Sequence, residues 1–234
     1  VFDTNFSADL TIMEEGSELL KRIREGGKLP MITSCSPGWV TYLEKHHPEL
    51  IGHLSTAKSP QAMFGAVAKT YYAQKMGWDP HDVVSVSVMP CTAKKMEAAR
   101  PQFYHNGKPD VDVVLTTQEI INMIKESGIQ LPQMELESPD LPFGLGSGAA
   151  VIYGSSGGVA ESVVRYCLPD KSKNTLRELQ YSPLRGNEAI REATVQVGER
   201  EIKLAVVHGL INAQKLLKEI DAGTAYYDLG EGMT

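Results

Sequence analysis

Two cysteines, each placed where an apolar run gives way to a helix, are the residues best suited to redox or metal chemistry. Cys35 follows the apolar run Leu29 to Ile32, and Pro37 then opens an amphipathic segment. Cys91 follows the β-prone run Val83 to Val88 in the same way. The amides and dipole of a helix N-terminus favour the thiolate, which is the form that reacts and binds metals. A single cysteine in such a turn is more often an inert core residue, but the repeated design indicates a reactive or metal-binding pair.

Two carboxylates could carry protons. Glu15 and Glu18 are three positions apart on a predicted helix, so they share one face of it. Proton transfer needs titratable or hydroxyl groups within hydrogen-bond reach of one another. An acidic pair of this kind is usually only a solvated surface, and the residues alone leave that interpretation as the default.

Composition excludes several classes of protein. The 234 residues are 42% hydrophobic and 22% charged, which is typical of a globular chain with a sizeable core. A net charge of −6 without a basic cluster argues against nucleic acid as a partner. No apolar run approaches the roughly 18 residues of a membrane span. Three cysteines do not suggest a disulfide framework, and so a reducing, cytoplasmic location is favoured. The six histidines are scattered along the chain, so no zinc site is predicted.

The elements that must position these groups alternate between helix and strand, which predicts an α/β fold. A β-hairpin is expected where two segments of alternating polarity flank Gly198-Glu199. The glycine-rich passage from Gly144 to Gly158 is not a dinucleotide-binding fingerprint, because it lacks the required glycine spacing. The strands are predicted over Leu29 to Ser34, Val83 to Val88, 111 to 116, 193 to 197 and 201 to 207. The helices are predicted over Ala8 to Glu25 with Ser7 as cap, Pro37 to His46, Pro60 to Met76 ended by Gly77, Thr117 to Glu126, Val159 to Cys167 and Gly209 to Ala222.

The two cysteine segments resemble the first two signature motifs of the di-iron (FeFe) hydrogenases. The second motif, Met-Pro-Cys-x-x-Lys-x-x-Glu, is matched completely by Met89, Pro90, Cys91, Lys94 and Glu97. The first, Thr-Ser-Cys-Cys-Pro-x-Trp, is matched over residues 33 to 39 except that a serine stands at the second cysteine. Two long motifs in the right order are a specific signal, and the resemblance runs over nearly the whole chain.

The resemblance implies a fold, a cofactor and a reaction. The fold would be a two-lobed catalytic domain, each lobe a twisted, mostly parallel sheet flanked by helices and incomplete at both ends, with residues 1–135 as first lobe and 136–234 as second. The cofactor would be an H-cluster, in which a four-iron cubane held by four thiolates is joined to a di-iron unit. The reaction would be the reversible oxidation of dihydrogen to protons and electrons.

The resemblance also assigns roles. The metal positions fall on Cys91 and Ser36, and the cofactor pocket on Lys94, Met89, Pro90 and Gln61. Lys94 would donate to an anionic cofactor ligand. The proton route would run through Cys35, Glu15, Ser55 and Glu18. Because Ser36 is a poor iron ligand, Cys35 could instead serve as a substitute ligand, and that alternative stays open.

The expected partners are dihydrogen, protons, and ferredoxin-like clusters or NAD(P)-linked electron-transfer subunits, with no nucleic acid and no membrane. Both ends look cut, since the final Glu231-Gly-Met-Thr corresponds to the opening of the third family motif. A fragment is expected, with a degenerate paralogue as the alternative. The rival functions are a non-catalytic relative that senses redox state or scaffolds a complex, and an iron–sulfur assembly protein.

Overall fold

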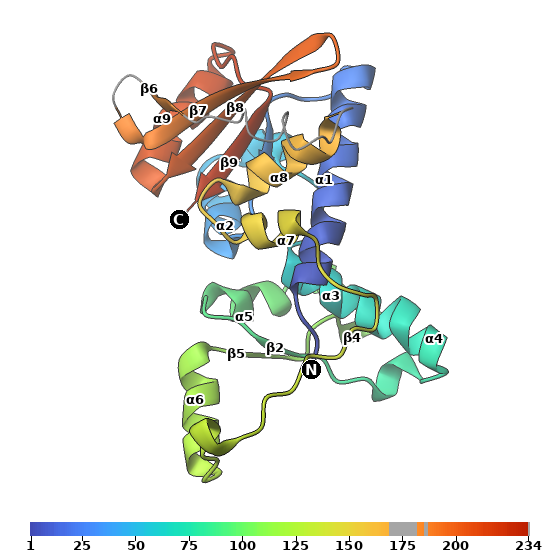
Figure 1. Ribbon diagram of the computed structural model, residues 1–234. Coiled ribbons are helices and arrows are strands. Elements are labelled where there is room, and N and C mark those ends of the chain that lie inside the picture. The colour runs from blue at the N-terminus through green and yellow to red at the C-terminus, as the bar shows by residue number, and fades with distance from the viewer. Residues whose placement is uncertain (169–181, 185–186, 234) are drawn as a thin grey trace. The chain divides into compact units, whose positions relative to one another are not determined.

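The chain divides into two compact units, each built from two separate segments. The computed structural model describes residues 1–168, 182–184 and 187–233 (Figure 1). Unit 1 comprises Val1–Ser7 and Pro60–Leu145, and unit 2 comprises Ala8–Ser59 and Gly146–Thr234. The expected single boundary after residue 135 does not coincide with this division, because residues 8–59 fold with the C-terminal segment.

Unit 2 is organised around a five-stranded sheet with the order β1-β9-β8-β7-β6. β9 pairs in parallel with β1 and β8, whereas β7 pairs antiparallel with β8 and β6. The α/β class is confirmed, with a sheet that is half parallel and half antiparallel. The predicted hairpin is β7–β8, joined at Gly198, whose φ of 64° suits a tight turn. The strands are β1 (Met31–Thr33), β6 (Ser182–Leu184), β7 (Asn187–Val197), β8 (Arg200–His208) and β9 (Leu229–Met233).

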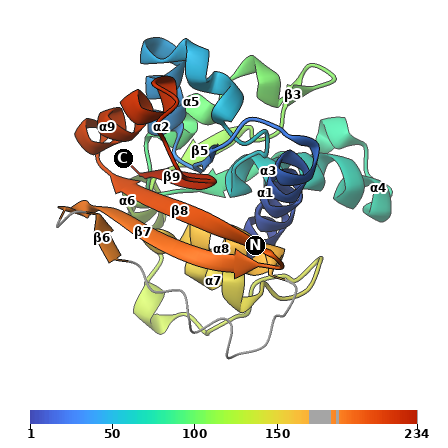
Figure 2. The same ribbon diagram turned by 90° about the horizontal axis from the view of Figure 1, so that it is seen from above.

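Helices cover both faces of this sheet (Figures 1 and 2). Alternate residues of β8 point to opposite faces, as a strand requires. Leu204 and Val206 pack with α1 and α8, while Ala205 and Val207 pack with α2 and α9. The helices are α1 (Asn5–Glu25), α2 (Pro37–His46), α7 (Gly148–Tyr153), α8 (Gly158–Cys167) and α9 (Leu210–Asp221).

The strand β9 was not predicted from the sequence. Its residues read Leu-Gly-Glu-Gly-Met, and two glycines in five positions oppose a strand assignment. Packing explains one of them, because a Cβ on Gly232 would lie 2.6 Å from the Trp39 ring. Tertiary contact therefore overrides local preference here.

Unit 1 is a smaller assembly whose longest element is a continuous helical run from Pro60 to Met76. It comprises α3 (Pro60–Val67), a π-helical turn (Ala68–Tyr72) and α4 (Ala73–Met76), and it ends at Gly77 as predicted, with φ 70°. The remaining elements are β2 (Val86–Val88), α5 (Ala93–Ala98), β3 (Tyr104–His105), β4 (Lys108–Pro109), β5 (Val113–Leu115) and α6 (Thr117–Glu126). Thr116 caps α6 through a capping box with Glu119.

The expectation of a buried strand over Val83 to Val88 is wrong in one respect. β2 does pair in parallel with β5, but its valines remain open: Val86 is 53% and Val88 is 50% exposed. A run of β-branched residues predicts strand, and does not by itself show that a second layer covers it. Within the described ranges no helix is both long and apolar enough to cross a bilayer.

Candidate functional site

The acidic residues predicted to carry protons lie on α1 in unit 2, and one of them, Glu18, is tightly held. Glu18 Oε2 accepts from the Ser55 hydroxyl at 2.9 Å and from the Thr56 amide at 2.8 Å. Its Oε1 accepts from Arg22 Nη2 at 2.6 Å and Nε at 3.0 Å, a two-point ion pair. Burial alone would raise the pKa of Glu18, but the bonds from Thr56, Arg22 and Ser55 outweigh it and lower that pKa. Glu18 is therefore a fixed, ionised acceptor.

Glu15 has the opposite character. Its side chain is fully buried, and its Oε2 has no hydrogen-bond partner among the described residues. The pKa of Glu15 is raised to about 8. Burial is the largest cause, and the negative charges of Glu231 and Glu18 add to it, while the Ser55 hydroxyl has a smaller opposing effect. Glu15 is thus protonated near neutral pH. The default interpretation of a solvated acidic face is wrong, since the helix turns this carboxyl into the protein.

The turn that carries Cys35 is held by the sheet. The Ser34 hydroxyl donates to the carbonyl of Gly232 at 2.9 Å and accepts from the Ser36 amide at 3.1 Å. Cys35 is partly buried and packs on the apolar cluster to which Ile12 of α1 contributes. Ile12 lies one turn before Glu15 on α1, so this apolar cluster includes the helical turn next to the one that carries the buried acid. Ser36 precedes α2 as its N-cap without a side-chain capping bond.

A second buried acid was missed by the sequence interpretation. Glu231 of β9 is 3% exposed, and its Oε2 accepts from the Ala160 amide at 2.8 Å at the start of α8. Burial raises the pKa of Glu231 to about 7, although the Ala160 bond lowers it in part. The signal available in the sequence was its place in the apparent opening of the third motif.

In unit 1 the predicted pocket residues form a buried polar network. Lys94 Nζ pairs with both carboxylate oxygens of Glu97, at 3.2 and 3.0 Å. Gln61 Nε2 donates to Glu97 at 3.3 Å, and Gln61 Oε1 accepts from the Ser87 hydroxyl at 2.9 Å. Lys94, Glu97 and Gln61 are all at most 7% exposed. A buried lysine is tolerated here because a carboxylate offsets its charge.

The thiol of the second motif lies outside that buried network. Cys91 is a free, exposed cysteine, Pro90 is exposed and Met89 is partly buried. The amide of Lys94 donates to the Cys91 carbonyl at 3.2 Å, and α5 begins two residues after Cys91, at Ala93. Cys35 and Cys91 belong to different units.

The described residues do not provide a complete site for a cubane cluster. Such a cluster takes four thiolates, and the chain has three cysteines. Cys167 is buried in the core and donates to the Gly16 carbonyl at 3.5 Å, so its thiol is not available to a cluster. No group of three metal-binding side chains is found within the described ranges.

Three partner residues complete these networks. Glu97 was named from the sequence as the last residue of the second motif, and it lies three positions after Lys94. Arg22 was missed, although its i+4 spacing to Glu18 was a usable signal. Thr56 carries no such signal, because its amide contact with Glu18 depends on where the loop returns to α1.

Fold and site together define an α/β protein with a buried protonated acid beside an anchored carboxylate, and with a thiol-bearing turn in each unit. The profile of the family described as "Iron only hydrogenase large subunit, C-terminal domain" matches residues 1–234. The chain belongs to that family.

Its relatives include both hydrogenases and assembly proteins. The chain is 47% identical over 233 residues to the NADP-reducing hydrogenase subunit HndD of Solidesulfovibrio fructosivorans, covering 97% of the chain and 40% of the relative. It is 44% identical over 218 residues to iron hydrogenase 1 of Clostridium pasteurianum, covering 93% of the chain and 38% of the relative. The cytosolic iron–sulfur assembly component 3 of Pongo abelii is 36% identical over 247 residues, covering 100% of the chain and 51% of the relative.

A variant of the FeFe-hydrogenase HydA1 of Chlamydomonas reinhardtii superimposes with a TM-score of 0.85 at 39% identity. That comparison covers 100% of this chain and 66% of the other. The chain therefore spans about two fifths of the first two relatives and two thirds of this solved structure.

Proposed function

We propose that the chain is part of a cytoplasmic hydrogenase that interconverts dihydrogen with protons and electrons, and that Glu15, Ser55 and Glu18 carry protons to and from Cys35. The observation that carries the proposal is the pairing of opposite protonation states. Glu15 is held neutral by burial, and Glu18 is held ionised by Arg22 and Thr56. Two solvated surface glutamates would both be ionised at neutral pH.

The Ser55 hydroxyl supports transfer between the two acids. It donates to Glu18 at 2.9 Å, and its remaining lone pairs can accept from a protonated Glu15. A proton that passes from Glu15 to the Ser55 oxygen displaces the hydroxyl proton toward Glu18, so one proton enters and one leaves. The family's iron cofactor would supply the redox chemistry. Electrons would come from ferredoxin-like clusters or an NAD(P)-linked subunit, as the name of HndD suggests.

The proposal is tested in the longest natural polypeptide that contains this chain, matured anaerobically. Glu18→Gln keeps the shape but cannot take up and release a proton at neutral pH. Cys35→Ser keeps a hydroxyl but replaces a thiol by a far weaker acid. Each change is expected to reduce hydrogen evolution from reduced methyl viologen by about 10²- to 10⁴-fold, with cluster spectra nearly unchanged.

The matched control is Glu14→Gln. Glu14 is exposed and lies about 100° around the helix from Glu15, so its change is expected to leave turnover intact. Equal losses in Glu14→Gln and Glu18→Gln would contradict the proposed route. Loss of the cluster in Cys35→Ser would make Cys35 a ligand instead of a proton donor.

A second candidate is a non-catalytic iron–sulfur assembly or redox-sensing relative. Ser36 at a ligand position supports it, as does the 36% identity to an assembly component. If this candidate is right, the matured protein contains iron but shows no hydrogen turnover with any viologen, and Glu18→Gln changes nothing measurable.

A further inference from the structure

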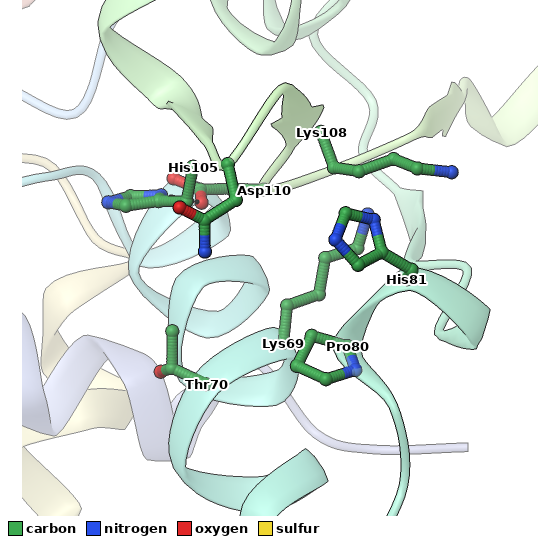
Figure 3. Close-up of a pocket in the computed structure, with 8 residues that line it drawn as sticks. Lys69, Thr70, Pro80, His81, His105, Lys108 and Asp110 are labelled. Atoms are coloured by element: carbon green, nitrogen blue, oxygen red, sulfur yellow. Dashed lines mark hydrogen bonds and ion pairs between the residues drawn. The ribbon is translucent and has the colours of Figure 1, made fainter.

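A cavity in unit 1 has no role in the proposed hydrogen chemistry. Its volume is about 300 Å³, and its walls come from the π-helical turn, the turn at residues 80–81 and the β3–β4 hairpin (Figure 3). This volume lies at the lower end of the range for small-molecule sites. The lining residues are Lys69, Thr70, Pro80, His81, His105, Asn106, Lys108 and Asp110.

Lys69 is buried at this cavity with one donor to spare. It is 7% exposed, and its Nζ contacts Asp112 at 2.6 Å and the Pro109 carbonyl at 2.7 Å. An ammonium group has three N–H donors. These two acceptors leave one N–H without a partner among the described residues. An unsatisfied buried donor is costly, so a ligand that accepts this hydrogen bond would be stabilised here.

The lining acid is already engaged. Asp110 is 2% exposed, and its Oδ1 lies 2.5 Å from His105 Nδ1. By contrast, the imidazole of His81 and the Nζ of Lys108 have no partner in the part of the chain that the structure describes. An imidazole can donate a hydrogen bond whether neutral or charged, and a lysine can only donate. His81 and Lys108 are therefore available donors, beside the amide of Asn106, which can both donate and accept.

The backbone supports a binding role independently. Lys69 and Thr70 lie in the π-helical turn, Ala68–Tyr72, which interrupts an otherwise α-helical run. Such turns are rare and often occur at functional sites, since they redirect side chains from the regular helical positions.

We propose that this cavity binds a small organic anion, with a phosphate or carboxylate head held by Lys69, His81 and Lys108. The cavity is several times larger than a bare phosphate, so the head would be carried on a compact apolar body that packs against Pro80 and the lysine stems. This site is separate from the buried acids of unit 2, and the inference stands whether or not the chain takes part in hydrogen turnover.

The test is to titrate the full chain separately with phenyl phosphate, benzoate, inorganic phosphate and benzyl alcohol. Binding is measured by calorimetry and by the NMR signals of the His81 and His105 imidazoles. Phenyl phosphate or benzoate is expected to saturate in the low millimolar range or below and to shift the His81 signals. Inorganic phosphate should bind more weakly, and benzyl alcohol should not bind.

His81→Leu, which removes a donor, and Lys108→Gln, which replaces a charged donor by a neutral amide, are each expected to weaken anion binding roughly tenfold or more. Lys75→Gln is the matched control, since Lys75 is exposed on the adjacent α4 and does not line the cavity. No saturable binding of either organic anion, equal binding of benzyl alcohol, or an equal loss in Lys75→Gln would overturn the proposal.

Discussion

The carboxyl of Glu15 links proton binding to the stability of unit 2. Its pKa is raised from an ordinary 4.5 to about 8 in the folded chain. Between these pH values the folded state holds a proton that the unfolded chain releases, so the free energy of unfolding falls as pH rises. Below about pH 4.5 both states are protonated and this cost disappears. Glu231, raised to about 7, acts in the same direction.

Glu15→Gln removes this pH dependence while keeping the neutral shape. Relative to the unchanged chain, the variant is expected to gain stability that grows from under about 1 kcal/mol near pH 5 to roughly 4 kcal/mol near pH 8, since each unit of pKa shift corresponds to about 1.4 kcal/mol. Urea unfolding across that range measures it, with Glu14→Gln as the exposed control. Parallel curves for Glu15→Gln and the unchanged chain would show that Glu15 does not titrate as described.

Arg22 fastens the loop that carries Ser55 to α1. Besides Glu18, its guanidinium donates to the carbonyls of Gly52 and His53, both at 3.3 Å, and of Leu54 at 2.7 Å. A lysine cannot reproduce this planar array of donors.

Arg22→Lys is therefore expected to lower the free energy of unfolding by about 1–3 kcal/mol. Arg24→Lys, an exposed change two residues away, should cost almost nothing. Chemical denaturation of both variants checks this, and equal stabilities would remove Arg22 from its anchoring role.

At the scale of single residues, the sequence was most informative where a family motif named the side chain. Glu15, Ser55 and Glu18 were singled out in advance, and the structure places the Ser55 hydroxyl in hydrogen-bond contact with Glu18. The raised pKa of Glu15 was not foreseeable, because it depends on burial by segments distant in sequence. Glu231 was missed for the same reason.

Among the elements, predictions succeeded where the signal was local. The helix Pro37–His46 and the run from Pro60 to Met76 have clear starts at proline, and the hairpin has a glycine turn. They failed where packing decides, as at the glycine-containing β9 and the short α7. Ser7, expected as a cap, lies inside α1, where its hydroxyl donates to the Thr4 carbonyl at 2.7 Å.

The close contact between α7 and α8 rests on one glycine. A Cβ on Gly158 would lie 1.8 Å from the Ile152 carbonyl oxygen, which is backbone and cannot move aside easily. Gly158→Ala is expected to destabilise the chain by more than about 2 kcal/mol.

Gly148 provides the matched comparison, because it also opens a helix but has nothing within 4 Å of the added carbon. Gly148→Ala is expected to be neutral or to stabilise by about 0.4–1 kcal/mol. Thermal melts of the two variants decide the point, and similar melting temperatures would mean that α7 can shift to make room.

For the molecule as a whole, the count of thiolates predicts its behaviour toward iron. Three cysteines, of which Cys167 is in the core, cannot complete a cubane. The 234-residue chain is expected to retain less than one cluster per chain, with labile iron, after anaerobic reconstitution. Iron analysis and EPR measure this. A stable, stoichiometric cubane would contradict the ligand count, and its loss in Cys35→Ser would then identify the extra ligand.

The pairing of β1 with β9 also fixes when the molecule can finish folding. Met31 is in register with Leu229, and the turn after β1 depends on the bond from Ser34 to Gly232. At synthesis rates of about 5–20 residues per second, roughly 10 to 40 s separate the two strands at the ribosome. Contacts so distant in sequence form late. Until β9 has emerged, Cys35 lies on an incomplete sheet edge, so translation itself sets the earliest moment at which this thiol is fixed in place.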